Sequence, residues 1–211
     1  MATTRIIPMH VNKGKTIAQC LTERTDYAKN PDKTEDGEYI SAYACDAKTA
    51  DSEFLLSKRQ YRQLTGREQA SDVIAYQIRQ SFKPGEVTPE EAHRIGMKLA
   101  REVLGDKYEF VLTTHIDKDH VHNHLIFNAV SFTDHKHYHS NKHSYHEIRR
   151  ASDQLCREHG LSVIVPGQDK GKSYIEHQAA QNGTSYKAKL KAAIDRLIPA
   201  SSSLEDLLAR L

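Results

Sequence analysis

The stretch His115-Ile-Asp-Lys-Asp-His-Val-His-Asn-His-Leu-Ile-Phe-Asn128 decides the fold that we expect for this chain. Strand-prone residues at 108–115 and 120–130 stand on either side of four turn-prone residues, Ile-Asp-Lys-Asp. Two strands joined by so short a connection form an antiparallel hairpin. The sequence therefore predicts a mainly antiparallel sheet around this hairpin.

Alternation along the second strand of the hairpin separates histidines from apolar residues. Successive side chains of a strand point to opposite faces, so His120, His122 and His124 share one face. Leu125 and Phe127 lie on the other face, where they can pack against helices. The hairpin thus carries a histidine face and a core face.

The histidine face is typical of a metal site. His115 ends the first strand, so a tight hairpin brings three or four imidazoles together. Neutral imidazole binds divalent first-row metals well, and three such ligands leave coordination positions open for a substrate. Four histidines on one buried face would be costly unless they bind something. Asp117 either orients a ligand imidazole or serves the turn, which aspartate favours in any case.

The rest of the chain predicts three more strands and four helices before residue 166. The predicted strands cover 3–11, 39–45 and 162–165, and the predicted helices cover 16–29, 71–82, 88–105 and 144–160. The best-defined helix starts at Thr88-Pro89 with Glu91 completing a capping box, and it stops at Gly105. The expected fold class is α+β, with a central, mainly antiparallel five-stranded sheet flanked by helices, plus C-terminal helices.

Two parts of the chain differ in composition. Residues 1–165 form the expected folded domain, and 166–211 form a polar connector followed by C-terminal helices near 184–198 and from Ser203. The last helical pattern runs to Leu211. We therefore expect a domain cut from a longer protein.

Composition excludes several classes of protein. The 211 residues hold 30 basic and 28 acidic side chains, so DNA binding would need local basic patches rather than overall charge. Three separated cysteines argue against a disulfide framework. The sequence has no apolar run of 18 residues and no signal-peptide core, so we expect no membrane span and a cytoplasmic location. Nine of the 13 histidines lie between residues 115 and 146, which directs the search for function there.

A metal bound by histidines suits chemistry on a phosphate, which requires a nucleophile. Water would make the protein a hydrolase, and a tyrosine would make it a covalent transferase. Tyr27 lies in the last turn of the predicted helix 16–29, where a side chain can face a cleft. Composition alone favours a Tyr27 ring that simply packs.

Four segments, in this order, resemble the relaxase or mobilisation nuclease domains of the MOB-P class, within the HUH endonuclease superfamily. They are 26–34 (DYAKNPDKT), 75–86 (AYQIRQSFKPGE), the motif HxDxxHxHxH with Asn128, and 148–161 (IRRASDQLCREHGL). The resemblance extends to about residue 165. Gln77 departs from it, because many relatives carry a histidine after the tyrosine.

The resemblance implies roles for several of these residues. Tyr27 is the implied nucleophile, which nicks one strand at an origin of transfer, forms a 5′-phosphotyrosine link and leaves a free 3′-hydroxyl. The implied metal ligands are His115, His122 and His124, and the implied metal is Mg²⁺ or Mn²⁺. We assign Asp117 as an orienting group or base. The residues in the second layer around the ligands would be His120 and Asn128.

The resemblance also implies partners. They are single-stranded origin-of-transfer DNA, accessory relaxosome proteins and a type IV secretion coupling protein, and we expect the domain to be a monomer without membrane contact. The candidate phosphate contacts are basic residues outside the histidine motif, namely Lys33, Arg79, Lys83, Arg149 and Arg150.

Three other functions stay open. A rolling-circle replication initiator of the same superfamily typically places its tyrosine after the histidine motif, whereas Tyr27 precedes it. A non-catalytic histidine-rich module that binds metal or DNA would form no covalent adduct. A metallohydrolase that uses water would release its product.

Overall fold

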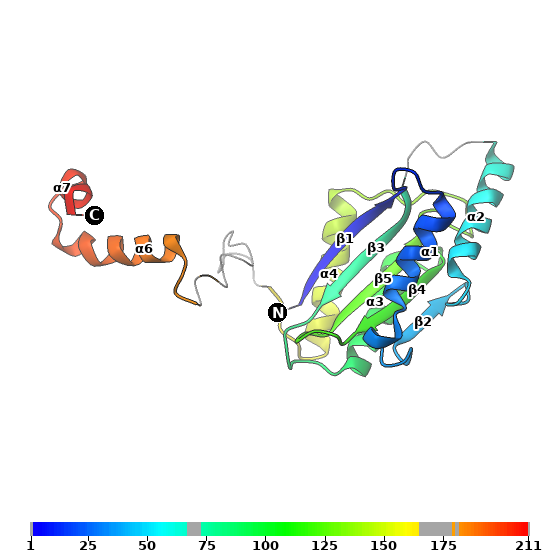
Figure 1. Ribbon diagram of the computed structural model, residues 1–211, viewed down its shortest axis with the longest axis horizontal. Coiled ribbons are helices and arrows are strands. Elements are labelled where there is room, and N and C mark those ends of the chain that lie inside the picture. The colour runs from blue at the N-terminus through cyan, green and yellow to red at the C-terminus, as the bar shows by residue number, and fades with distance from the viewer. Residues whose placement is uncertain (1, 67–72, 165–178, 180–181, 211) are drawn as a thin grey trace. The chain divides into compact units, whose positions relative to one another are not determined.

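The computed structural model describes residues 2–66, 73–164, 179 and 182–210. The chain divides into two compact units, Met1–Ile164 and Val165–Leu211. The first unit contains a five-stranded sheet with the order β1-β3-β5-β4-β2, in which all neighbouring strands are antiparallel (Figure 1). This sheet confirms the predicted α+β fold.

The bounds of the strands and helices of the first unit are as follows. The strands are β1 (Thr3–His10), β2 (Ile40–Tyr43), β3 (Val73–Ser81), β4 (Phe110–His115) and β5 (His122–Asn128). The helices are α1 (Ile17–Ala28), the short 3-10 helix η1 (Pro31–Lys33), α2 (Ala50–Thr65), α3 (Pro89–Leu104) and α4 (Lys142–Glu158).

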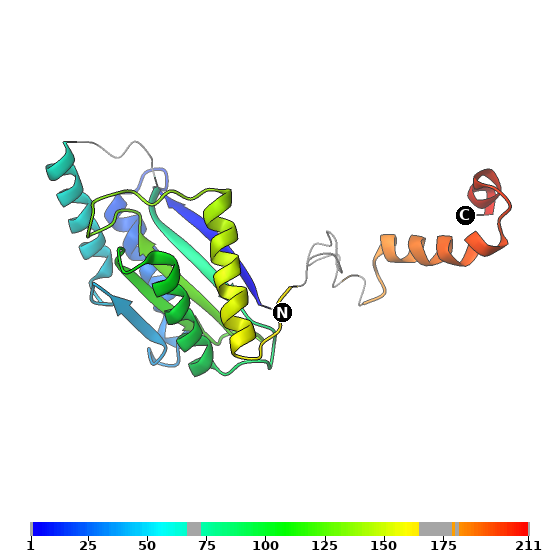
Figure 2. The same cartoon turned by 180° about the vertical axis from the view of Figure 1, so that it is seen from behind.

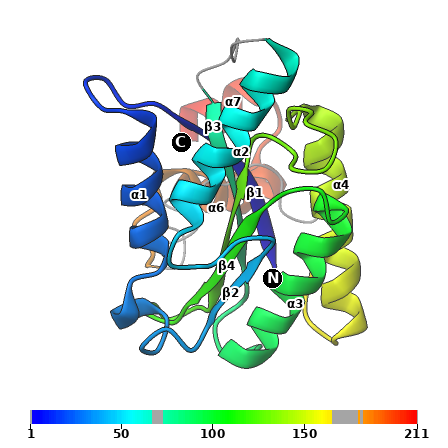
Figure 3. The same cartoon turned by 90° about the vertical axis from the view of Figure 1, so that its right-hand side faces the viewer.

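Two helices cover each face of the sheet. Figure 3 shows α1 and α2 on one side of the strands and α3 and α4 on the other, and Figure 2 shows the α3–α4 side. Leu21 of α1 and Phe54 of α2 share a buried apolar cluster with Ile126 of β5. Leu104 of α3 and Leu125 of β5 belong to a second cluster on the opposite face. The two faces of β5 therefore have different environments, as alternation predicts.

The hairpin predicted from the central motif is confirmed as β4 and β5. The register pairs His115 with His122 and Thr113 with His124. Strand β5 begins at His122, so the prediction that His120 lies on the strand was wrong. His120 belongs to the turn between the two strands.

The prediction of a helix over 71–82 was also wrong, because Val73–Ser81 forms strand β3. β3 lies between β1 and β5 and pairs with both. Ladder hydrogen bonds on two sides and burial of Ile74 and Ile78 outweigh the helix propensity of the glutamine and arginine residues in this stretch.

Three further boundaries differ from expectation. The predicted strand 162–165 is reduced, in its described part, to one parallel bridge between Ala2 and Val163. Helix α2 was not predicted. Helix α4 begins at Lys142, because the Asn141 side chain accepts the amide of Ser144 and caps the helix three residues earlier than expected. The element order is thus βαβαβαββα.

A chain of polar side chains runs along the α3 side of the sheet, directly behind the hairpin. Nδ1 of His93 lies 2.8 Å from the Thr114 hydroxyl, which donates to Oδ1 of Asn123 at 2.7 Å. Nδ2 of Asn123 donates to Oε1 of Gln80 at 3.0 Å and to the carbonyl of Ala92 at 2.7 Å. These bonds connect α3 with β3, β4 and β5 and favour one register of the hairpin.

Gly96 of α3 makes room for this polar chain, and we predict that Gly96→Ala destabilises the domain. A Cβ atom at position 96 would lie 2.5 Å from Nδ2 of Asn123 and 3.0 Å from Cδ2 of Leu112. Glycine to alanine normally stabilises a helix by about 1 kcal/mol, so the sign of the effect is informative. Urea unfolding should show a loss of about 2 kcal/mol. The control is Glu102→Ala on the exposed side of α3, and a Gly96→Ala variant as stable as that control would contradict the close packing.

The described residues of the second unit form the C-terminal helices that the sequence predicts. They are α6 (Tyr186–Leu197), the 3-10 helix η2 (Ile198–Ala200) and α7 (Leu204–Arg210). Most of the predicted connector lies outside the described residues. In the described ranges, no helix has both the length and the apolar character needed to cross a bilayer.

Candidate metal centre and nucleophile

Three histidines of the hairpin converge on the α1 side of the sheet. His115 of β4 and both His122 and His124 of β5 each offer one ring nitrogen, and these three atoms lie within 4.8 Å of one another. The exposed fractions of the three residues are 0%, 7% and 6%. The strands therefore hold three buried imidazoles on rigid backbone.

Hydrogen bonds fix which nitrogen of each ring points inward. Nε2 of His115 lies 2.8 Å from the carbonyl of Ala28, and Nδ1 of His122 lies 3.3 Å from the carbonyl of His120. A carbonyl only accepts, so these nitrogens carry the ring protons. Nδ1 of His124 contacts the side-chain amide of Gln77. The other nitrogen of each ring is left available as a ligand.

The donor set fits a divalent cation. Nδ1 of His115 is buried and has no hydrogen-bond partner among the described residues. An unpartnered buried ring nitrogen is costly unless it binds a ligand. Three imidazoles whose outer nitrogens are tied in this way match the usual arrangement around a metal ion.

Burial keeps the three imidazoles neutral, as metal ligation requires. Desolvation is the largest cause, and it lowers the pKa of His115, brings the pKa of His122 to about 4 and brings the pKa of His124 to about 2. The neighbouring histidines lower the pKa values of His122 and His124 further. The three rings are therefore uncharged at neutral pH.

These shifts predict that the domain in EDTA loses stability as the pH falls below about 6.5. In the unfolded chain the histidines take up protons there, whereas folded His122 stays neutral down to a pKa of about 4. The loss at pH 5 should be about 2 kcal/mol for each of His122 and His124. Urea midpoints at pH 7.5, 6 and 5 measure it, and a double variant with glutamine at both positions should lose most of the slope. Equal midpoints for the wild type across this range would contradict the buried, neutral triad.

Tyr27 lies beside the triad in the last turn of α1. Its ring centroid is 6.3 Å from that of His115, and its side chain is 59% exposed. Helix α1 starts at a capping box between Thr16 and Gln19, which sets where its last turn falls. The structure thus brings the predicted nucleophile and the predicted ligands together.

Lys33 and Asp117 complete the surroundings of Tyr27. Nζ of Lys33 lies 4.1 Å from the centroid of the Tyr27 ring and 3.7 Å from Oδ2 of Asp117. A hydrogen bond with Tyr27 is the largest cause that raises the pKa of Lys33, so this amine is a cation. The amide of Ile116 donates to the Lys33 carbonyl at 2.9 Å and ties η1 to the hairpin turn. The sequence had suggested Lys33 as a DNA contact and did not reveal its contact with Tyr27.

A groove leads to this site between α1 and the strands β1 and β3. Its volume is about 490 Å³. Arg79 lies on the same face of β3 as Gln77 and is paired with His124 in the sheet register. The lining residues are Ile7, Pro8, Met9, Asn12, Glu23, Arg24, Tyr27, Gln77, Arg79 and His124.

Comparison with known proteins identifies the family. A family model described as "Relaxase: MobA/VirD2-like, nuclease domain" matches residues 27–161, which is more than half of the chain. The chain belongs to this relaxase family. The match confirms the resemblance that the sequence motifs indicate, and it begins at Tyr27.

Curated relatives agree with this assignment. The relaxase domain is 36% identical over 172 residues to a Protein rlx of Staphylococcus aureus, a match that covers 78% of the chain and 51% of the relative. It is 28% identical over 222 residues to the group II intron-interrupted relaxase LtrB of Lactococcus lactis subsp. cremoris, with 88% of the chain and 38% of the relative covered. The chain thus spans about half the length of these relatives or less.

Solved structures share the fold. The MobM relaxase domain (MOBV), in a manganese-bound crystal structure with plasmid pMV158 oriT DNA, matches with a TM-score of 0.56 and 12% identity over 85% of this chain and 98% of that one. A structure reported as the molecular basis of vancomycin resistance transfer in Staphylococcus aureus matches with a TM-score of 0.51 and 14% identity, over 80% and 99%. At these identities the likeness shows the fold of the relaxase domain.

The other predicted residues of the relaxase domain lie outside the triad. The ring of His120 is 5.1 Å from that of His122, and its carbonyl accepts from His122. Asn128 is not brought to the triad, because it donates to Glu109 at 2.7 Å and to the carbonyl of Phe54 at 3.1 Å. Asn128 shares the strand face with the ligands but lies at the far end of β5.

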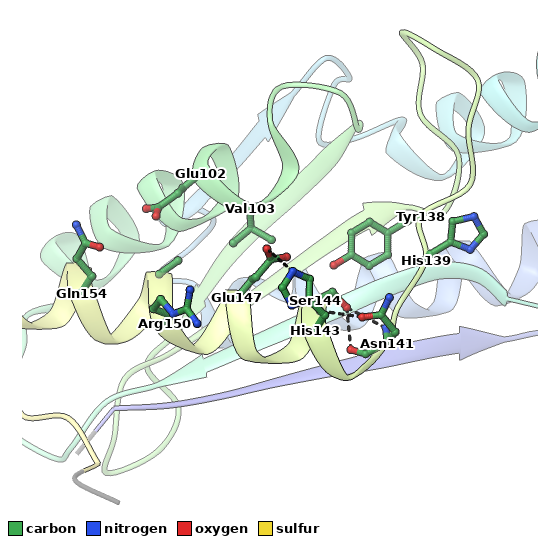
Figure 4. Close-up of a pocket in the computed structure, with 11 residues that line it drawn as sticks. Glu102, Val103, Tyr138, His139, Asn141, His143, Ser144, Glu147, Arg150 and Gln154 are labelled. Atoms are coloured by element: carbon green, nitrogen blue, oxygen red, sulfur yellow. Dashed lines mark hydrogen bonds and ion pairs between the residues drawn. The ribbon is translucent and has the colours of Figure 1, made fainter.

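The basic residues predicted to contact DNA are divided between several places. Arg79 lines the groove, and Lys83 is exposed just beyond the end of β3. Arg149 and Arg150 are on α4, across the sheet from the triad. Arg149 pairs with Asp153 at 3.8 Å. Arg150 lines a second pocket of about 500 Å³ beside α4, which Figure 4 shows.

Proposed function

We propose that this chain nicks one strand of DNA at the origin of transfer of a conjugative or mobilisable element and joins itself to the cut strand through Tyr27. The observation that carries the proposal is an exposed phenol beside three buried, neutral histidines at the end of a groove. Membership of the relaxase family supports it, as does the oriT DNA bound to the structurally similar MobM domain.

A divalent cation, Mg²⁺ or Mn²⁺, is the proposed cofactor. Its ligands would be Nδ1 of His115 and Nε2 of His122 and His124, the nitrogens that hydrogen bonding leaves free. When bound, it supplies positive charge that stabilises the negative charge building on the scissile phosphate. The manganese in the MobM structure supports this choice of cofactor.

Tyr27 is the proposed nucleophile. Its Oη forms a bond to phosphorus while the bond from phosphorus to the 3′-oxygen breaks, and the 3′-hydroxyl leaves after taking up a proton. One phosphodiester replaces another, so the step is close to thermoneutral and can be reversed to rejoin the strand. This balance suits nicking and strand transfer rather than degradation of DNA.

Lys33 and Asp117 are proposed to assist Tyr27. The Lys33 ammonium over the Tyr27 ring favours the negative charge that develops as the phenol loses its proton. Asp117 is the proposed orienting group or base, and its ion pair with Lys33 supports the orienting role. The ion pair holds the ammonium next to the nucleophile.

The DNA is proposed to lie single-stranded in the groove, where a phosphate can reach Tyr27. Arg79 on the floor of the groove is the proposed phosphate contact, with Lys83 further along the strand. Binding that uses such contacts weakens as salt rises. Arg149 and Arg150 would contact DNA only if it also passed across the α4 side of the sheet.

For the whole protein, we propose a cytoplasmic location and assembly with accessory relaxosome proteins and a type IV secretion coupling protein. The family supports these partners. A rolling-circle initiator is the second candidate of the same superfamily. The position of Tyr27 before the histidine motif favours the relaxase.

The test is an adduct assay with Mn²⁺ and a single-stranded oligonucleotide that carries the element's own origin sequence. We expect an SDS-stable adduct with the fragment on the 3′ side of the nick, together with a free fragment that ends in a 3′-hydroxyl. A hydrolase that uses water would release both fragments, and a binding module would leave the oligonucleotide intact. Either result would reject the proposal.

A further inference from the structure

Gln77 contacts the metal centre through a side chain. It lies on β3, opposite Ile126 of β5, and its carboxamide touches Nδ1 of His124. It also lines the groove that contains Tyr27 and Arg79. The groove, the nucleophile and one ligand thus meet at a residue to which the sequence gave no role.

The three ligand histidines differ in what holds their outer nitrogens. His115 and His122 donate to backbone carbonyls, which every residue at those positions would supply. The outer nitrogen of His124 faces a side chain instead. The orientation of His124 is therefore the one that depends directly on the identity of another residue.

We propose that Gln77 is a positioning residue that sets the orientation and tautomer of His124, and through them the affinity of the centre for its cation. This role rests on the proposed metal centre. When Nε2 of His124 is a ligand, the ring proton is on Nδ1 and needs an acceptor. The carboxamide oxygen of Gln77 provides that acceptor.

A carboxamide can face Nδ1 in two ways. With its oxygen toward the ring it accepts the Nδ1 proton and leaves Nε2 free for the cation. Turned by 180°, its NH₂ group donates to Nδ1 and the ring proton moves to Nε2, where it blocks ligation. Glutamine thus tolerates both tautomers and tightens binding less than an acceptor-only group would.

A carboxylate at this position has no such second arrangement. It accepts in either orientation, adds negative charge beside the ligand and makes the imidazole a stronger donor to the cation. Arg79 is two residues away on the same face of β3, so a carboxylate at position 77 would have a cation nearby. Glutamate and leucine, both close to glutamine in size, should therefore shift affinity in opposite directions.

The experiment measures Mn²⁺ affinity of the full 211-residue chain from the electron paramagnetic resonance signal of free Mn²⁺. Gln77→Leu should weaken binding about 10-fold or more, and Gln77→Glu should tighten it several-fold. The controls are Gln154→Leu and Gln154→Glu on the exposed side of α4, which should leave affinity unchanged. Because damage to the fold cannot tighten binding, a tighter Gln77→Glu variant supports the role directly.

Other outcomes overturn the proposal. A Gln77→Leu variant with wild-type affinity, or equal weakening in both Gln77 variants, would show that Gln77 contributes packing alone. A wild-type chain that binds no Mn²⁺ would remove the metal centre itself and with it the proposed function. As a second readout, adduct formation by Gln77→Leu should recover when Mn²⁺ is raised, since the residue acts through binding of the cation and not on the DNA. Failure to recover at saturating Mn²⁺ would also count against the role.

Discussion

Replacing Tyr27 by phenylalanine should abolish the SDS-stable protein–DNA adduct. The substitution removes the one oxygen that is proposed to bond to phosphorus and keeps the ring that lies under Lys33. The side chain is 59% exposed, so the domain should keep its fold and its stability. We expect at least a 10³-fold loss of adduct formation on a denaturing gel, as is typical when a covalent nucleophile is removed.

Two controls give this result its meaning. Tyr145→Phe changes an exposed tyrosine on α4, across the sheet from the triad, and should form the adduct at the wild-type rate. Mn²⁺ and DNA binding by Tyr27→Phe should stay close to wild type, because the phenol oxygen is not a predicted ligand. An adduct that persists in Tyr27→Phe would assign the nucleophile to another residue.

Local signals made part of this fold predictable. Helix α3 has a threonine cap, a proline in its first turn and a glycine in the left-handed region at its end, all within a continuous stretch. The hairpin has alternating faces and a short connection. In both cases the residues that decide the structure are neighbours in the sequence.

Strand β3 was not predictable in this way. Its apolar residues Ile74 and Ile78 are four apart, which suits a helix as well as a strand with two covered faces. What makes it a strand is pairing with β1 and β5, which lie far away in the sequence on either side. Long-range pairing of this kind leaves no local pattern.

The site shows the same division. The three histidines follow from spacing on a hairpin, but the place of Tyr27 depends on a bond between η1 and the hairpin turn. The contact of Gln77 depends on the pairing of β3 with β5. Asn128 shares a strand face with His124, yet four residues along a strand put it about 13 Å away. A shared face alone did not make it a neighbour of the metal centre.

Truncation of one ligand is the second change with a large expected effect. His122→Ala should weaken Mn²⁺ binding by more than about 100-fold, since two imidazoles remain where three converge. Adduct formation should fall with it, whereas affinity for the origin oligonucleotide should change by only a few-fold. The groove residue proposed to contact phosphate, Arg79, is untouched by the substitution. Calorimetric titration with Mn²⁺ and an anisotropy assay with labelled DNA separate the two effects.

His120→Ala is the matched control, because it removes an imidazole two residues away without removing a ligand of the triad. The contact of His120 with Nδ1 of His122 is made by the backbone carbonyl, which alanine also provides. Mn²⁺ affinity should therefore stay within a few-fold of wild type. Equal weakening in His120→Ala and His122→Ala would place the His120 ring in the metal centre. Parallel loss of DNA binding and cleavage in His122→Ala would instead assign His122 a role in holding the hairpin together, because removal of a metal ligand alone leaves the groove in place.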